Sequence, residues 1–258
     1  MPTVNLLAVS VGNTRTRVGA FVDDQLAETA CFENAKTDKI TEAIDHAFAP
    51  LSERPDAQVL LSSVNPDVAG PIEEVLKSHL KREVHRVERD VPIPVGRQLD
   101  REAMVGEDRL LNAAAAFDVL RQACVVVDAG TAITVDFVDG AGTFHGGAIA
   151  PGAQLMLDAL NRRTAQLPDS DFDVPKEVIG HNTVEAMRSG VFFALRGLVQ
   201  QLTEQIAEHN GHYPLVVATG GDGNLVFRDW ELVDRVVPDL TLRGIAVTLR
   251  KQLEVKGE

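Results

Sequence analysis

A strand–turn–strand pattern that occurs twice constrains the fold of this chain more than any other feature. The segment AVSVGNTRTRVGAF (residues 8–21) is an apolar strand, a glycine turn and a second strand, and VVVDAGTAITVDFV (residues 125–138) repeats that order. Aligning Gly12 with Gly130 places Ser10 opposite Asp128. A repeat of this kind predicts two related halves, one of which has a hydroxyl where the other has a carboxylate.

Apolar strands and helical patterns alternate along the rest of the chain. This alternation predicts the α/β fold class. The segment 91–96 contains two prolines and is expected to be an extended connection, and Asn182 and Glu185 have capping-box spacing at the start of a long helix. The remaining elements are expected as strands at 57–64 and 214–223 and as helices at 71–81, 105–123, 152–163 and 184–208.

The composition limits the classes of ligand. The chain has 258 residues, is 45% hydrophobic and carries a formal net charge of −13. Nucleic acids and anionic membrane surfaces repel such a protein. A phosphate ligand remains compatible with this charge, because backbone N–H groups bind phosphate without any lysine.

The cysteines and the N-terminus predict a reduced, cytoplasmic protein. Cys31 and Cys124 are the only cysteines, and their spacing matches neither a zinc site nor a redox motif. The apolar run near the N-terminus follows no basic region and soon meets Gly12 and Asn13. It is expected to be a buried first strand, with neither a signal peptide nor a membrane span.

The two glycine turns are candidate phosphate-binding loops. Consecutive backbone N–H groups in a small-residue turn bind anions, and neighbouring hydroxyls add donors. A single turn of this kind is most often an ordinary β-hairpin turn, whereas two matched copies favour phosphate binding. Neither a Walker loop nor a G-x-G-x-x-G fingerprint is present, and ATGGDG (residues 218–223) is a candidate nucleoside-binding segment. The residues concerned are Gly12, Asn13, Thr14 and Thr16 in the first turn and Gly130, Thr131 and Thr134 in the second.

The segment GEDR (residues 106–109) is a candidate catalytic segment. A carboxylate at a helix start beside an arginine is ionised at neutral pH and can accept a proton from a bound hydroxyl. Arg109 could bind a substrate carboxylate in a bidentate manner. Considered alone, however, the segment is more typical of a helix cap with an exposed ion pair.

Seven segments together resemble one family. SVGNTRT, SSVNP, GEDRLLNAAAA, VDAGTAITVDFVD, GGAIAPG, IGHNTVEAMRSGVFF and VVATGG occur in the order and spacing of the type III pantothenate kinases, from about residue 6 to residue 245. The resemblance implies two related actin-like (ribonuclease H-like) domains with the ATP cleft between them. The expected domains are residues 1–117, with the first phosphate loop and the substrate segment, and residues 118–258, with the second phosphate loop and the adenosine segment.

The resemblance also implies an activity. Enzymes of this family phosphorylate pantothenate with ATP to 4′-phosphopantothenate, the first step of coenzyme A biosynthesis. They need Mg²⁺ and a monovalent cation, K⁺ or NH₄⁺. They are homodimers in which the neighbouring subunit closes each pantothenate pocket.

The family's site residues carry over by motif. Asp108 matches the general base, Asp128 the ligand of the monovalent cation and Thr131 an ATP contact. The pantothenate site is matched by Gly106, Glu107, Asp108, Arg109 and Thr183, with Leu99 at a further lining position. The first phosphate loop is matched by Ser10, Val11, Gly12, Asn13, Thr14, Arg15, Thr16 and Arg17.

Three positions depart from the family pattern. Ser10 stands where the family has an aspartate that acts through Mg²⁺, and a serine brings no negative charge to that metal. Leu99 replaces a tyrosine of the pantothenate pocket, and Glu107 replaces a small residue. The first change predicts weakened metal use and reduced turnover, and the other two put substrate affinity or identity in question.

These departures leave two alternatives beside an active, slow pantothenate kinase. One is a non-catalytic relative that binds nucleotide or pantothenate and acts by association. The other is a kinase for a different small hydroxy acid. Asp136 and Asp139 could contribute metal-bound waters, but solvent-facing positions in a strand and a turn are the stronger expectation for both.

Overall fold

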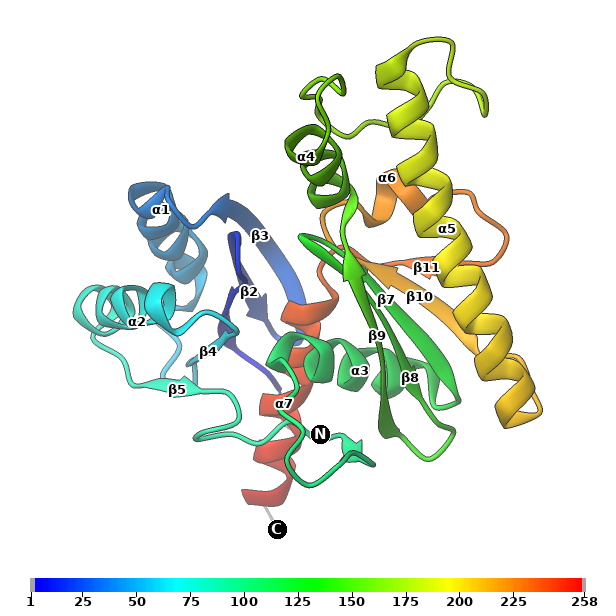
Figure 1. The fold of residues 1–258 in the computed structure, drawn as a ribbon. Coiled ribbons are helices and arrows are strands. Elements are labelled where there is room, and N and C mark those ends of the chain that lie inside the picture. The colour runs from blue at the N-terminus through cyan, green and yellow to red at the C-terminus, as the bar shows by residue number, and fades with distance from the viewer. Residues whose placement is uncertain (1–2, 257–258) are drawn as a thin grey trace. The chain divides into compact units, whose positions relative to one another are not determined.

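The protein is described by a computed structural model of residues 3–256, and its contacts divide it into two compact units (Figure 1). The first unit comprises Met1–Gly96, Asp100–Val119 and Asp239–Glu258. The second comprises Arg97–Leu99 and Leu120–Pro238. The C-terminal segment therefore belongs with the N-terminal half of the chain.

The first unit is built on a five-stranded mixed sheet in the order β3-β2-β1-β4-β5. Strands β1, β2 and β3 are antiparallel neighbours, and β4 and β5 continue the sheet in parallel with β1. The strands are β1 Leu6–Val11, β2 Arg15–Val22, β3 Gln25–Glu33, β4 Gln58–Ser63 and β5 Val84–Arg86. The helices of this part of the chain are α1 Thr37–Phe48, η1 Ala49–Leu51, α2 Pro66–Leu80, α3 Glu107–Leu120 and α7 Leu240–Lys256.

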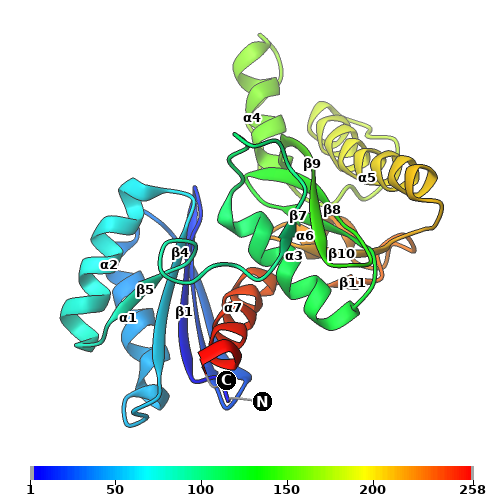
Figure 2. The ribbon, with the colours of Figure 1, turned by 90° about the horizontal axis from the view of Figure 1, so that it is seen from below.

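Side-chain alternation along β1 separates the two faces of this sheet. Val9 and Val11 pack into the apolar core beneath α1 and α2, together with Leu61 of β4. Ser10 points to the opposite face, because successive side chains of a strand alternate, and α7 packs against that face (Figure 2). At Gly19 a Cβ atom would lie 2.8 Å from Cδ1 of Leu242, so the missing side chain lets α7 approach the sheet.

The second unit has a six-stranded sheet in the order β11-β10-β7-β8-β9-β6. Its strands are β6 Gly96–Arg97, β7 Cys124–Ala129, β8 Ala132–Val138, β9 Thr143–Pro151, β10 Leu215–Thr219 and β11 Arg235–Val236. Its helices are α4 Ala153–Arg163, α5 Thr183–Asn210 and α6 Gly223–Phe227. The long α5 runs beside the sheet (Figure 1) and buries Val191 and Leu195 in a core with Val125 and Val127 of β7.

The expected elements form close to their predicted positions, and the α/β class is confirmed with one mixed sheet in each unit. The capping interaction at α5 is present, because the backbone N–H of Glu185 donates to Oδ1 of Asn182 (2.9 Å). The Glu185 carboxylate in turn accepts a hydrogen bond from the backbone N–H of His181, the residue before the N-cap (3.0 Å). Within residues 3–256, no helix combines the length and the apolar character that a membrane crossing requires.

One predicted boundary is wrong. The helix expected at 71–81 begins five residues earlier, at Pro66, directly after Asn65. Proline is favoured in the first turn of a helix, where its missing N–H would have had no intrahelical acceptor. The second proline, Pro71, lies inside the helix and masked the continuous helical pattern.

Candidate active site

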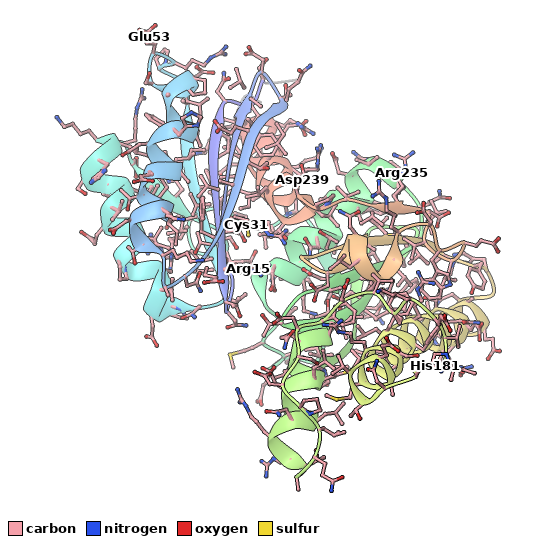
Figure 3. The ribbon with its side chains drawn as sticks, turned by 90° about the horizontal axis from the view of Figure 1, so that it is seen from above. Arg15, Cys31, Glu53, His181, Arg235 and Asp239 are labelled. Carbon is pink, nitrogen blue, oxygen red and sulfur yellow. The ribbon has the colours of Figure 1, made fainter. Side chains whose placement is uncertain are left out.

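The first glycine turn joins β1 to β2 and is fixed at its base by a backbone hydrogen bond. The backbone N–H of Gly12 donates to the carbonyl of Arg15 (2.9 Å). Thr16 is buried, whereas Asn13, Thr14 and Arg15 are exposed. Figure 3 shows Arg15 at the start of β2, with Cys31 on the neighbouring strand β3. The tip of the turn is thus open to a ligand while its base is fixed.

Asn34, directly after β3, holds this turn in place. Its Nδ2 donates to the carbonyls of Gly12 (2.9 Å) and Asn13 (3.1 Å), and its Oδ1 accepts from the hydroxyl of Thr16 (2.8 Å). Its backbone N–H donates to the carbonyl of Thr14 (2.9 Å). Sequence reasoning missed Asn34, because nothing in the local pattern indicates that the end of β3 returns to the first turn.

The GEDR segment forms the beginning of α3, as expected. Glu107 and Asp108 lie in the first turn of that helix, where the helix dipole favours negative charge. Oε2 of Glu107 accepts hydrogen bonds from the hydroxyl of Ser62 (2.7 Å) and the backbone N–H of Ser63 (3.0 Å). These contacts fix the helix start to the end of β4.

Asp108 is a half-buried carboxylate with a raised pKa. Burial raises the pKa of Asp108, and a hydrogen bond from the backbone N–H of Arg109 to Oδ1 (2.8 Å) counteracts part of that rise. A Cβ atom at Gly106 would lie 2.5 Å from Oδ1 of Asp108. The glycine therefore leaves room for this carboxylate in its observed position.

Burial also raises the pKa of Glu107, while the hydrogen bonds from Ser62 and Ser63 counteract that rise. Two neighbouring carboxyl groups with raised pKa values at one helix start indicate a candidate functional site. Glu107, Asp108 and Arg109 are all half-buried, so the segment is less exposed than a helix cap with a solvent-facing ion pair would be.

The second glycine turn lies in the second unit, between β7 and β8. The backbone N–H of Gly130 donates to the carbonyl of Ala132 (3.0 Å), and that of Gly152 donates to the carbonyl of Thr131 (3.0 Å). In strand register, Asp128 lies between Thr134 of β8 and Thr219 of β10. Three oxygen-bearing side chains thus share one face of this sheet.

The ATGGDG segment packs directly on the second turn. Gly220 has a φ of +95°, and a Cβ atom there would lie 2.2 Å from the carbonyl oxygen of Ala129. The backbone N–H of Asp222 donates to the same carbonyl (2.9 Å). The segment therefore needs its first glycine both for conformation and for close approach.

The remaining predicted residues of the second unit lie apart from this turn in sequence. Thr183 is the exposed first residue of α5. Leu99 is half-buried, and its Cδ2 lies 3.4 Å from where a Cβ atom of Gly146 would be.

The expectation that Asp136 faces solvent is wrong: it is 2% exposed, because it lies on an interior strand opposite Val126 and Gly147. Asp139 forms the turn expected of it and accepts from the backbone N–H groups of Ala141 and Thr143.

Solved structures of similar fold define the class. A Baf family protein from Campylobacter jejuni aligns with a TM-score of 0.61 at 20% identity, covering 96% of this chain and 99% of that one. The activator of 2-hydroxyisocaproyl-CoA dehydratase from Clostridium difficile, with bound ADPNP, aligns with a TM-score of 0.57 at 12% identity, covering 98% and 97%. MreB5 of Spiroplasma citri, bound to AMPPNP, aligns with a TM-score of 0.51 at 12% identity, covering 99% and 100%. The fold is that of the actin-like ATPases and sugar kinases.

Within that class the family is defined by sequence. Residues 6–205 match the type III pantothenate kinase family, and the chain belongs to it. Relatives of that name are 36% identical in Dehalococcoides mccartyi strain CBDB1 (94% of each chain covered), 42% identical in Akkermansia muciniphila (80% of this chain and 82% of the relative) and 34% identical in Frankia alni (96% and 100%).

Proposed function

We propose that this protein transfers the γ-phosphoryl group of ATP to the hydroxyl group of pantothenate, giving 4′-phosphopantothenate and ADP, the first step of coenzyme A synthesis. Family membership supports the reaction. The observation in this chain that supports the reaction is the half-buried Asp108 carboxylate at the start of α3, which has a raised pKa and for which Gly106 leaves space.

Asp108 acts as the general base. Its carboxylate accepts the proton of the pantothenate hydroxyl while that oxygen forms a bond to the γ-phosphorus, and the bond from phosphorus to the β–γ bridging oxygen breaks to release ADP. A base whose pKa is raised toward the working pH takes this proton more readily than an ordinary aspartate. Most of the remaining acceleration in phosphoryl transfer comes from positioning and charge neutralisation.

The pantothenate-binding residues are Gly106, Glu107, Asp108, Arg109 and Thr183, with Leu99 at the further lining position. A guanidinium binds a carboxylate through two parallel hydrogen bonds, which suits Arg109 to the pantothenate carboxylate. A leucine at residue 99 contributes apolar surface and no hydroxyl, so the affinity for pantothenate there rests on packing.

ATP is bound by the two glycine turns, residues 10–17 of the first unit and Thr131 of the second. The exposed tip of the first turn, fixed from behind by Asn34, supports this role for Asn13 and Thr14. A divalent cation such as Mg²⁺ neutralises the phosphate charge when bound.

Asp128 holds the monovalent cation. Its neighbours in register, Thr134 and Thr219, both have buried hydroxyl oxygens without a hydrogen-bond partner in the described part of the chain. A hydroxyl–carboxylate–hydroxyl row of this kind offers the oxygen donors that K⁺ or NH₄⁺ requires. We further propose a cytoplasmic homodimer, in which the neighbouring subunit closes each pantothenate pocket.

The test is ADP release from ATP with pantothenate, Mg²⁺ and K⁺, with the phosphorylated product identified by mass spectrometry. Pantothenate-dependent ADP release that falls when K⁺ is replaced by Na⁺ is the expected result. Stabilisation by ATP without ADP formation would instead identify a non-catalytic nucleotide-binding protein. Turnover on a different hydroxy acid alone, in a panel of such acids, would overturn pantothenate as the substrate.

A further inference from the structure

The Glu107 carboxylate lies on the same sheet face as Ser10, the residue that stands where the family has an aspartate. Ser10 of β1 and Ser62 of β4 are register partners in parallel strands. Register partners of neighbouring strands point to the same face of a sheet, with strands about 4.8 Å apart. Because Glu107 accepts the hydrogen bond of the Ser62 hydroxyl at 2.7 Å, its carboxylate occupies the same face, one strand away from Ser10.

Hydrogen bonds fix the position of the Glu107 carboxylate, but no positively charged side chain of the described residues forms an ion pair with it. Both of its hydrogen bonds go to Oε2, and within residues 3–256 no donor to Oε1 and no cationic side chain within 4.0 Å of either oxygen is found. Arg86 attracts the charge only from a greater distance, and Glu88 repels it. A half-buried carboxylate of this kind costs free energy unless a cation compensates it.

The donors around it suit Mg²⁺. Mg²⁺ prefers oxygen ligands, retains several waters and is bound in kinases through one or two carboxylates and the substrate phosphates. The free Oε1 of Glu107, the hydroxyl of Ser10 and the open turn at residues 12–15 supply oxygen donors and a phosphate-binding loop on the same unit. Sulfur and imidazole donors, which would favour other metals, are not among these residues.

We propose that Glu107 supplies, from the start of α3, the carboxylate that orients the hydrated Mg²⁺ of the bound nucleotide, in place of the carboxylate absent at Ser10. Glu107 is thus a positioning residue for the nucleotide's metal through its carboxylate, and its part in the pantothenate-binding segment is limited to its backbone. The proposal rests on the proposed function in that ATP is the ligand of the first turn. It reverses the expectation that Ser10 leaves the metal weakly held.

The experiment measures ADP affinity by isothermal titration calorimetry, with saturating Mg²⁺ and with EDTA, for four proteins: wild type, Glu107→Gln, Glu88→Gln and the double variant Ser10→Asp/Glu107→Gln. The ratio of the two affinities reports the coupling between metal and nucleotide. Wild type and Glu88→Gln are expected to show a coupling of about tenfold or more. In Glu107→Gln the ratio of the ADP affinities with Mg²⁺ and with EDTA is expected to fall close to one. In the double variant this ratio is expected to return to the wild-type value.

The amide oxygen of Glu107→Gln can still accept from Ser62 and Ser63, so the fold is expected to be retained; circular dichroism checks this. Coupling in Glu107→Gln equal to that of wild type would overturn the proposal, as would a double variant that stays uncoupled. Because ADP binding needs no phosphate acceptor, a protein that proves inactive on pantothenate would contradict the proposed function and leave this test intact.

Discussion

The side chains of Asn112 and Thr241, which are 129 residues apart in the sequence, join helices α3 and α7: the Thr241 hydroxyl donates to Oδ1 of Asn112 at 2.8 Å, and both residues are buried. Asn112 lies one helical turn after Asp108 in α3, and Thr241 is in the first turn of α7. The C-terminal helix thus fixes the helix that carries the proposed base.

Replacing Thr241 with valine is expected to lower the free energy of unfolding by about 1–2 kcal/mol, because it removes a buried hydrogen bond while preserving shape. Urea unfolding followed by circular dichroism measures this. Thr248→Val is the control: Thr248 is also buried, but its hydroxyl donates to the carbonyl of Gly244 within the same helix. An equal loss in both variants would show that the Asn112–Thr241 bond has no special contribution.

Replacing Gly220 with alanine is expected to destabilise the second unit by about 2 kcal/mol or more. The substitution forces a Cβ atom onto the Ala129 carbonyl and a side chain into a positive-φ conformation. Gly190→Ala is the control, because Gly190 lies in the interior of α5 with no atom within 4 Å of an added Cβ. That variant is expected to gain up to about 1 kcal/mol. Thermal unfolding that ranks the two variants in the opposite order would contradict the packing of residue 220 on the second turn.

Replacing Asp108 with asparagine is expected to raise the melting temperature at pH 7. The folded-state pKa of Asp108 lies above its unfolded value, so the native state binds the proton more tightly. The free energy of unfolding therefore falls as pH rises from the ordinary aspartate pKa through the raised folded value. The asparagine cannot ionise, so the free energy of unfolding of Asp108→Asn does not fall in this way. Its higher melting temperature relative to wild type is expected to vanish below about pH 4. A melting temperature below that of wild type at pH 7 would show that the ionised carboxylate stabilises the fold.

The two cysteines are expected to react very differently with a thiol reagent. Cys31 is exposed on β3, whereas Cys124 is buried in β7, and burial raises the pKa of its thiol to about 12. Titration with Ellman's reagent should modify one thiol in the native protein and two in guanidinium chloride. Cys31→Ser should abolish the native reaction, and rapid native labelling of two thiols would contradict the burial of β7.

The fold could be predicted from sequence where local pattern determines structure. The apolar runs of β1 and β7 and the Asn182–Glu185 cap are local signals, and each was sufficient to place an element. Helix α7 has no such signal for its position, because its packing against the sheet depends on the absence of a side chain at Gly19 of β2, more than two hundred residues earlier.

The candidate site could be predicted only in part for the same reason. Asp108 was found because its motif is contiguous in sequence. Asn34 and Ser62 were missed, because each acts on a partner from a different element: Asn34 on the turn after β1, and Ser62 on Glu107 of α3. Such roles depend on strand register and on the placement of α3, which no single segment encodes.

The role of Asp108 as the base of a pantothenate kinase is tested most directly by kcat for pantothenate-dependent ADP release in wild type and Asp108→Asn. ADP affinity is measured in parallel. Loss of a general base is expected to lower kcat about a hundredfold or more while ADP binds equally well to both proteins. Undiminished turnover in Asp108→Asn, with ADP still bound, would contradict the claim.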